Sequence, residues 1–188
     1  MAQQEQQTCL IQPPSGEGPP VVAHTYPIPK IEKPSEVLLR VSAVALNPTD
    51  YKIPEFHPAP AAIMGCDFMG IVVAAGVDVE EGRGIGVRLC GSVHGSNPEN
   101  INSGAFAQYI VADSRLLVQV PSTWSDLEGA ALGGIGWATV ALAMEDSLGL
   151  TGLPSRPEPE RPDGSRVPVL VYGGATATGT IACQILAR

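Results

Sequence analysis

The stretch Pro168-Val-Leu-Val-Tyr172-Gly-Gly-Ala-Thr-Ala-Thr-Gly179-Thr-Ile-Ala-Cys-Gln-Ile-Leu-Ala-Arg188 decides how the rest of the sequence is interpreted. Its valine-rich run, Val169–Tyr172, follows a proline-rich segment and is typical of a buried parallel strand. The small residues that follow indicate a tight turn, and the apolar spacing from Thr180 to Ala187 predicts a helix. A strand, a glycine-rich turn and a helix open a dinucleotide-binding fold, in which the helix N-terminus receives a pyrophosphate.

This dinucleotide-binding unit is expected to be incomplete. A full βαβ unit needs about 30 residues, and the residue that selects the ribose follows the glycines by about 20 positions. Counted from Gly173, that selector would fall beyond Arg188. The match to G-x-G-x-x-G is imperfect because Thr176 stands where the middle glycine is expected. On the local sequence alone, a plain strand-to-helix turn is an equal alternative.

Composition narrows the class of protein. The chain has 188 residues, of which 44% are hydrophobic, so it is expected to bury a substantial core. The net charge of −8 argues against a nucleic-acid or anionic-membrane surface. The longest apolar run, Ala130–Met144, is interrupted by glycines, and the N-terminus lacks the features of a signal peptide. These features predict a cytoplasmic protein, and we expect a monomer.

The four cysteines are far apart in sequence and form no C-x-x-C pair: Cys9, Cys66, Cys90 and Cys183. They are interpreted as reduced, partly buried thiols, and no disulfide is expected.

The order of elements predicts a β-rich domain followed by helices. Short strands separated by glycine and proline indicate a barrel or sandwich. Ser125-Asp-Leu-Glu128 forms a capping box that opens a helix reaching Leu132. The strands are expected at 8–11, 21–26, 36–46, 71–75, 87–90, 105–112 and 115–120, with a helical turn at 49–52 before Pro54. A second helix is expected at 137–148, and a proline-rich loop at 151–166.

This order resembles the medium-chain dehydrogenase/reductase superfamily. The matching stretches are Val41-Ser-Ala-Val-Ala-Leu-Asn47-Pro-Thr-Asp50-Tyr-Lys52, Gly65-Cys-Asp67-Phe-Met-Gly70-Ile-Val-Val-Ala-Ala-Gly76 and Gly104-Ala-Phe-Ala-Gln-Tyr109. Trp124–Leu132 and Trp137-Ala-Thr139 resemble the family's helix pair behind the active site. Three stretches are similar to fungal trans-acting enoyl reductases of the lovastatin-pathway type, which serve highly reducing polyketide synthases. They are Ala141-Leu-Ala-Met144, the long proline-rich insert after it and Val169-Leu-Val-Tyr172-Gly-Gly-Ala-Thr-Ala-Thr178.

The resemblance implies an α+β / α/β fold: a GroES-like β-barrel followed by the start of a Rossmann domain. The implied division is a barrel at 1–124, a helical connection at 125–150, a loop at 151–166 and the incomplete Rossmann domain at 167–188. It covers about the first half of a family member. One departure is Glu80-Glu-Gly-Arg-Gly-Ile-Gly-Val-Arg88, which replaces the family's Val-Gly-Asp-Arg-Val turn.

A zinc site is not expected. The zinc-dependent branch of the superfamily needs three protein ligands, with nitrogen or sulfur donors among them. Here the Asn47–Asp50 turn occupies the first ligand position, and Gly65-Cys66-Asp67 replaces Gly-His-Glu. We interpret Cys66 as a buried thiol beside a capping carboxylate, Asp67. His24, His57 and His94 match no catalytic position of the family.

The resemblance assigns the site residues. A tentative catalytic role falls to Lys52, which would supply positive charge near the cofactor phosphates or the substrate carbonyl; a solvated lysine is the competing interpretation. Contacts to NADPH are implied for Thr49, Asp50, Tyr51, Lys52, Ala175, Thr176, Ala177 and Thr178. A substrate-pocket wall is implied for Thr139, Val140, Ala141, Leu142, Ala143, Met144, Glu145 and Asp146, for which helix packing is the alternative.

The implied function is hydride transfer from NADPH to an enoyl thioester carried by a highly reducing polyketide synthase or a synthase–peptide synthetase hybrid. Two alternatives stay open. One is a truncated, inactive remnant or synthase-binding protein, and the other is a quinone-reductase-like oxidoreductase. Because most of the cofactor domain would lie beyond Arg188, we expect the 188-residue chain alone to have little or no reductase activity.

Overall fold

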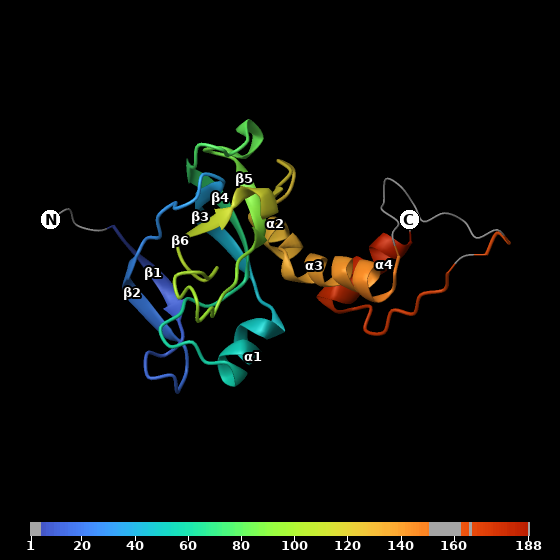
Figure 1. Ribbon diagram of the computed structural model, residues 1–188, viewed down its shortest axis with the longest axis horizontal. Helices are drawn as coiled ribbons and strands as arrows, with labels where there is room; N and C mark the ends of the chain where they lie inside the picture. The colour runs from blue at the N-terminus through green and yellow to red at the C-terminus, as the bar shows by residue number, and fades with distance from the viewer. Residues whose placement is uncertain (1–4, 151–162, 166, 188) are drawn as a thin grey trace. The chain divides into compact units, whose positions relative to one another are not determined.

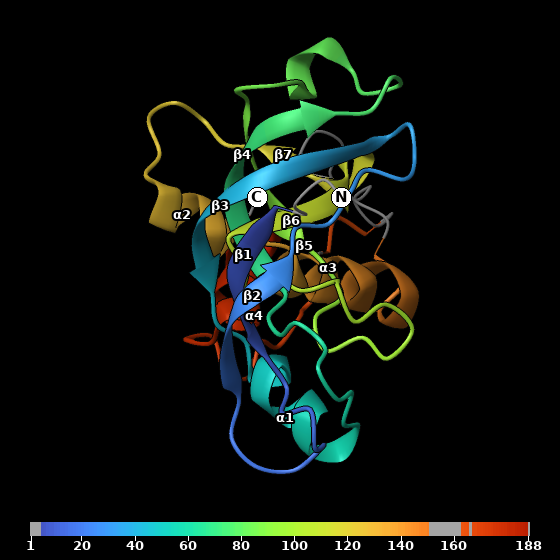
Figure 2. The ribbon, with the colours of Figure 1, turned by 90° about the vertical axis from the view of Figure 1, so that its left-hand side faces the viewer.

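Two antiparallel sheets build the first of the two units into which the chain divides, and this unit ends at Gly134 (Figures 1 and 2). The computed structural model describes residues 5–150, 163–165 and 167–187. β1 (Gln6–Ile11) and β2 (Val21–Pro27) form a two-stranded ribbon. The second sheet has the order β6-β3-β4-β5-β7, with β3 at Glu36–Ala45, β4 at Asp67–Ala75, β5 at Arg88–Ser92, β6 at Tyr109–Asp113 and β7 at Val118–Gln119.

The central strand β4 is buried on both faces. Its neighbouring residues Phe68 and Met69 point to opposite faces, because side chains alternate along a strand, and both are 0% exposed. Phe68 belongs to the main core, which the ribbon helps to cover, whereas Met69 packs with Cys90 and Val120 beneath α2. The five-stranded sheet therefore separates two apolar clusters.

The ribbon is joined to the rest of the unit by two isolated bridges. Cys9 pairs with Ala107 and Ile11 pairs with Ile63, so β1 is held by the segments that precede β6 and β4. Leu10 N–H also donates to the Phe106 carbonyl at 2.8 Å. These bonds draw the ribbon toward the sheet and confirm the predicted GroES-like barrel.

Two predicted strands are shorter in the structure. The strand predicted at 105–112 corresponds to β6, and the one predicted at 115–120 corresponds to β7. Most backbone bonds of residues 105–108 go to β1 and to the segment before β4, and only the Gln108 carbonyl bonds to β3, so the ladder of β6 begins at Tyr109. After β6 the chain makes a 3-10 turn at Ser114–Leu116 and then the two-residue strand β7. The Arg83 guanidinium donates to the carbonyls of Ser114 and Leu117, which stabilises this turn. Arg83 itself ends a 3-10 turn at Glu81–Arg83.

The helix after β3 is longer than predicted. The sequence predicted a turn at Thr49–Lys52 that ends before Pro54, but α1 runs from Pro48 to Phe56. Proline inside a helix removes one N–H donor and clashes with the preceding turn. Pro54 lies near the end of α1, which stops at Phe56, and His57 N–H donates to the Ile53 carbonyl at 2.7 Å.

The capping box at the start of α2 (Asp126–Leu132) is confirmed. Ser125 Oγ accepts the Glu128 N–H at 3.2 Å, and Glu128 Oε2 accepts the Ser125 N–H at 2.8 Å. Arg88 on β5 ties this helix to the sheet, because its Nη2 donates to Asp126 Oδ1 at 2.7 Å. The helix ends at Gly133, which has a φ of +45°.

The second unit begins at Ile135 and contains α3 (Ile135–Leu142), a π-helical turn (Ala143–Ser147) and α4 (Ala177–Leu186). The predicted helix at 137–148 therefore starts two residues earlier and changes type at Ala143. The glycine at 136 lies inside α3, where Ile181 of α4 packs against it. In the predicted loop at 151–166, only residues 163–165 belong to the described part of the chain.

The predicted strand at Val169–Tyr172 is wrong. These residues have no regular secondary structure, and Leu170 and Tyr172 are 92% and 99% exposed. A parallel strand is stabilised by hydrogen bonds to neighbouring strands, and no strand of the second unit is present among its described residues. The local sequence has strand propensity, but the bonding partners are missing from the described residues.

By length and composition alone, the run Asp126–Ser147 could cross a membrane, with a mean hydropathy of 1.4. The sequence had predicted no such run. In the structure Gly133 divides it into α2 and α3, and α2 packs its Gly129 and Ala130 against the sheet. A helix that packs in a protein core meets the same criterion of length and hydropathy.

Candidate active site

The Asn47–Lys52 turn follows β3 and includes the start of α1. Hydrogen bonds between its own residues hold it in place. The buried Asp50 accepts the Asn47 N–H on Oδ2 at 2.7 Å, and the Asp50 N–H donates to the Asn47 carbonyl at 3.0 Å. Burial raises the pKa of the Asp50 carboxyl, and the nearby Asp67 adds to this. We therefore interpret Asp50 as a residue that holds the turn, although the resemblance had implied that it contacts cofactor.

Asp67 joins this turn to the end of the first unit. Asn47 Nδ2 donates to Asp67 Oδ2 at 2.9 Å, and Gly134 N–H donates to Asp67 Oδ1 at 3.0 Å. The carboxylate is 4% exposed, so both bonds form away from bulk water. Its interpretation as a capping carboxylate is confirmed by the bond to Gly134. Its connection to Asn47 was not predicted, because Asn47 follows one strand and Asp67 begins another.

Cys66 is buried, and the carboxylates of Asp50 and Asp67 both act on its thiol. Burial raises the pKa of its thiol to about 11, and the negative charge of Asp50 contributes to the shift. A thiol that stays protonated is a poor metal ligand and a poor nucleophile. Among the residues that the structure describes, no group of three or more His, Cys, Asp or Glu side chains forms a metal site.

The thiols should differ sharply in reactivity. Cys183 is exposed, whereas Cys9, Cys66 and Cys90 are buried. Burial raises the pKa of Cys9 and Cys66 to about 11, which lowers their thiolate fraction about a hundredfold relative to a thiol of pKa 9. We expect iodoacetamide at pH 8 to modify Cys183 first and the other three only after unfolding. Intact-mass measurement counts the adducts; fast addition of two or more to the native chain would contradict the burial.

Pro48, Tyr51 and Lys52 are the exposed residues of the turn. Lys52 Nζ lies 5.9 Å from the centre of the Tyr51 ring, which is within the range of a cation–π contact. Thr49 is half-buried. The turn therefore presents one aromatic ring and one ammonium group to solvent. The hydrogen bonds between Asn47 and Asp50 hold the backbone of the turn.

The glycine-rich turn before α4 is closely packed. Gly173 has a φ of +84°, and a Cβ on Gly179 would lie 2.2 Å from the Gly173 carbonyl oxygen. Glycine is needed at both positions, because the first has a positive φ and the second has no room for a side chain. Thr176 is the N-cap: its Oγ1 accepts the Gly179 N–H at 3.1 Å and donates to the Gly173 carbonyl at 2.8 Å.

The end of this turn is open to a ligand. Ala175, Thr176 and Ala177 are exposed, and Thr178 is half-buried, with its hydroxyl 3.3 Å from that of Thr176. The helix that begins at Ala177 has ten residues, so its first-turn N–H groups and its dipole favour an anion at this end.

The segment 139–146 combines a regular helix with the π-helical turn. Thr139 Oγ1 donates to the Ile135 carbonyl at 2.6 Å, and Val140 is buried. π-Helical turns occur frequently at functional sites. The exposed members of this segment are Thr139, Ala141, Leu142, Ala143, Glu145 and Asp146, and Met144 is half-buried.

The predicted site residues fall in both units. Thr49–Lys52 belong to the first unit with Asp67, and residues 139–146 and 175–178 belong to the second. Within the second unit α3 contacts α4, and the Cβ of Ala177 would lie 4.0 Å from a Cβ on Gly136. The N-termini of α3 and α4 therefore lie close together within the second unit.

Comparison with known proteins gives consistent matches. Residues 33–122 match the alcohol dehydrogenase GroES-like domain. The trans-enoyl reductase sthE of Phaeosphaeria nodorum is 49% identical over 184 residues, which are 96% of this chain and 49% of that protein. The chain spans about half the length of the curated relatives it matches.

Solved structures share the fold. An alcohol dehydrogenase superfamily protein from Novosphingobium aromaticivorans is 26% identical, with a TM-score of 0.75 over 98% of this chain and 51% of that one. The quinone oxidoreductase of Thermus thermophilus, whose structures include a complex with NADPH, is 24% identical. Its TM-score is 0.63 over 94% of this chain and 48% of its own.

Proposed function

The chain belongs to the medium-chain dehydrogenase/reductase superfamily, and we propose that it carries the barrel and the first phosphate-binding turn of a trans-acting enoyl reductase. The observation that carries this proposal is the 49% identity to a trans-enoyl reductase along 96% of the chain. The quinone-reductase alternative rests on solved structures such as the one at 24% identity, which supports the fold alone.

The proposed cofactor is NADPH, and the turn before α4 fits a phosphate group. The close approach of Gly179 to Gly173 leaves no room for a side chain, and the exposed N-terminus of α4 offers N–H groups to an anion. The Thr176 and Thr178 hydroxyls stand beside these groups as further hydrogen-bonding partners. Ala175 and Ala177 keep the approach unobstructed because their side chains are small.

When bound, NADPH would supply a hydride to the β-carbon of the enoyl thioester. Negative charge then develops on the thioester oxygen, and the α-carbon takes up a proton. Lys52 is the exposed cation of the Asn47–Lys52 turn and would stabilise charge on a phosphate or on that oxygen. Tyr51 orients the ammonium through its ring, and Asp50 and Asp67 hold the turn.

The substrate is proposed to be a polyketide chain bound as a thioester to a carrier domain of a highly reducing polyketide synthase or hybrid. Residues 139–146 would form a wall of its pocket, with Ala141, Leu142 and Ala143 as the exposed apolar surface. We place this reaction in the cytoplasm, and propose that the enzyme acts as a monomer in trans.

The exposure of Leu170 and Tyr172 supports the expectation of low activity for this chain by itself. Both side chains are almost fully accessible, although they belong to a run with strand propensity. Large apolar side chains as exposed as these usually mark an interaction surface. We expect the isolated 188-residue chain to oxidise little or no NADPH when given an enoyl thioester.

The test uses the protein purified from its native source, the Lys52→Ala variant and the Lys30→Ala variant as a control. Both lysines are exposed in the first unit. Loss of the Lys52 cation should lower kcat/KM for NADPH-dependent reduction of an enoyl N-acetylcysteamine thioester about tenfold, because a charged hydrogen bond is lost. Lys30→Ala should change it less than twofold. Equal kcat/KM values for the two variants would show that Lys52 does not take part in the reaction. Absence of any reduction by the wild-type protein would refute the proposed function.

A further inference from the structure

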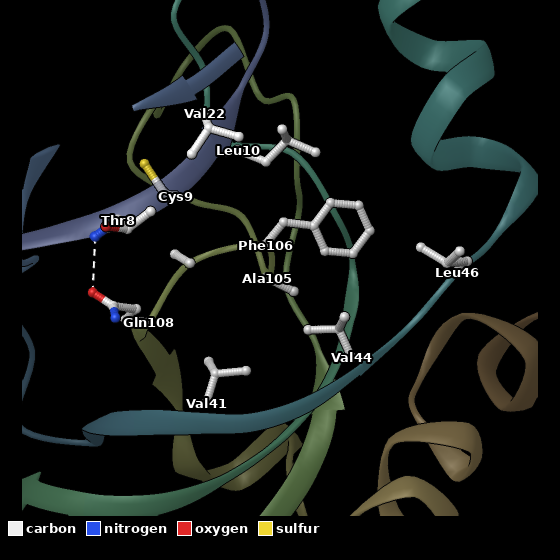
Figure 3. Close-up of a pocket in the computed structure, with 11 residues that line it drawn as sticks. Thr8, Cys9, Leu10, Val22, Val41, Val44, Leu46, Ala105, Phe106 and Gln108 are labelled. Atoms are coloured by element: carbon white, nitrogen blue, oxygen red, sulfur yellow. Dashed lines mark hydrogen bonds between the residues drawn. The ribbon is translucent and has the colours of Figure 1, made fainter. Parts of the chain in front are cut away.

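An apolar groove with a volume of about 500 Å³ runs along the first unit between β1 and the second half of β3 (Figure 3). β6 pairs with β3 over Glu36–Arg40, and the residues of β3 that follow border the groove. The volume lies within the range of about 300–1,000 Å³ that is usual for sites of small organic ligands.

Apolar side chains line most of the groove, and polar groups lie at one end. Figure 3 shows Thr8 and Gln108 together at one end, where Thr8 N–H donates to Gln108 Oε1 at 2.8 Å. Leu46 lies at the other end. The side chains between and around these ends are hydrocarbon: Leu10, Val22, Val41, Val44, Leu46 and Phe106.

The groove is preformed because its central ring is held in place. Phe106 lies directly on the backbone of Gly65, where a Cβ would come within 2.2 Å of Phe106 Cδ1. The Phe106 carbonyl accepts from Leu10 N–H, and its own N–H donates to the Met64 carbonyl at 2.9 Å. A ligand therefore meets a fixed wall and loses little affinity to reorganisation.

The groove is continuous with the candidate active-site turn. β3 passes Val41 and Val44 and reaches Leu46, and the chain then enters α1 (Figure 3). Leu46 immediately precedes Asn47, the first residue of the turn that presents Lys52. Leu46 is 81% exposed, so a hydrocarbon ligand would cover apolar surface that now faces water.

We propose that this groove binds the apolar acyl chain of the thioester, with the chain's far end toward Thr8 and Gln108. The proposal rests on the proposed function and names the part of its substrate that the first unit recognises. None of the eleven lining residues carries a charge, which suits an alkyl chain. At the polar end Gln108 is exposed and accepts the Thr8 N–H on Oε1, so this end opens to water.

The test measures binding of saturated N-acetylcysteamine thioesters, which cannot be reduced, by NMR titration of the chain. Transfer of one methylene from water to an apolar site is worth about a fourfold gain in affinity. We expect the octanoyl thioester to bind at least tenfold more tightly than the butanoyl thioester. A nitroxide at the far end of the acyl chain should broaden the amide signals of Thr8 and Gln108.

Leu46→Gln and Leu116→Gln form a matched pair, because the two leucines are 81% and 77% exposed in the same unit and neither replacement disturbs a core. Leu46→Gln should weaken octanoyl binding about fivefold or more, and Leu116→Gln should leave it unchanged. Equal effects of the two variants, or nitroxide broadening away from Thr8 and Gln108, would overturn the proposal. Concentration-dependent shifts of the same signals without ligand would instead identify a second copy of the chain as the occupant.

The outcomes separate this inference from the proposed function. Binding that depends on chain length in the groove, together with no NADPH-dependent reduction by the native protein, supports the groove and rejects the reductase. Reduction with no dependence on acyl length or on Leu46 rejects the groove and leaves the reductase standing.

Discussion

Replacing Gly95 with alanine is expected to lower the free energy of unfolding by at least about 3 kcal/mol, because any side chain at this position would overlap neighbouring atoms. A Cβ at this position would lie 2.1 Å from the Gly65 carbonyl oxygen and 2.7 Å from the Gly65 nitrogen. These are backbone atoms of a buried residue whose φ is +85°, so they cannot move aside as the end of a flexible side chain could.

The surroundings make this strain difficult to relieve. The loop that contains Gly95 is bonded to the segment before β4, because Ser96 N–H donates to the Ile63 carbonyl at 2.7 Å and Val93 N–H to the Cys66 carbonyl at 3.0 Å. Moving Gly95 away from Gly65 would stretch both bonds. The Gly65–Asp67 segment also supports Phe106 and the Asn47 turn, so the damage should extend to the candidate site.

Gly82→Ala is the matched control for this substitution. Gly82 lies in the 3-10 turn at Glu81–Arg83, and a Cβ there would meet no atom within 4 Å. Alanine at such a position restricts the unfolded chain and should be neutral or stabilise by about 0.4–1 kcal/mol. Urea unfolding of both variants measures the difference. A Gly95→Ala variant within about 1 kcal/mol of the wild type would contradict the described packing.

Asp67→Ala is expected to lower the free energy of unfolding by about 3 kcal/mol. The substitution removes the acceptor of the Asn47 Nδ2 bond and of the Gly134 N–H bond in a place that water scarcely reaches. A hydrogen bond to a charged group is worth about 1.5–3 kcal/mol, and a buried donor left without an acceptor adds a desolvation penalty. Asp67→Asn should cost less, because its amide oxygen can still accept one of the two bonds.

The control for this prediction is Asp78→Ala, an exposed aspartate in the same unit, which should change stability by less than about 0.5 kcal/mol. The comparison is made by thermal and urea unfolding at neutral pH. In the native protein, Asp67→Asn should also lower kcat/KM, because Asn47 begins the turn that carries Lys52. Equal stability of the Asp67→Ala and Asp78→Ala variants would show that the carboxylate does not hold the turn.

Features that depend on residues close together in the sequence were predictable. Ser125 and Glu128 form their capping box with each other, three residues apart, so the start of α2 follows from the sequence alone. The glycine turn at Gly173 is local for the same reason, whereas α4 begins at Ala177, three residues before the predicted start at Thr180. Alternating apolar residues in β3 and the run in β4 predicted the barrel strands because both strands pair along their length.

Features that depend on distant partners were not predictable. Val169–Tyr172 has the composition of a strand, but a strand also needs a neighbour, and the described residues of its unit provide none. The Gly65–Gly95 contact and the Asp67–Asn47 bond join residues 30 and 20 positions apart. The groove combines β1, β3 and the residues before β6, so no local pattern marks it.

The central claim is that this chain is part of an enoyl reductase, and the most direct measurement follows the transferred hydrogen. The protein purified from its native source would be incubated with NADPH deuterated at C4 of the nicotinamide and an enoyl N-acetylcysteamine thioester, and the product analysed by mass spectrometry and NMR. The account predicts a saturated thioester with one deuterium at the β-carbon. An enoyl thioester that stays unchanged, while a quinone added in a parallel incubation is reduced at the expense of the same NADPH, would contradict it.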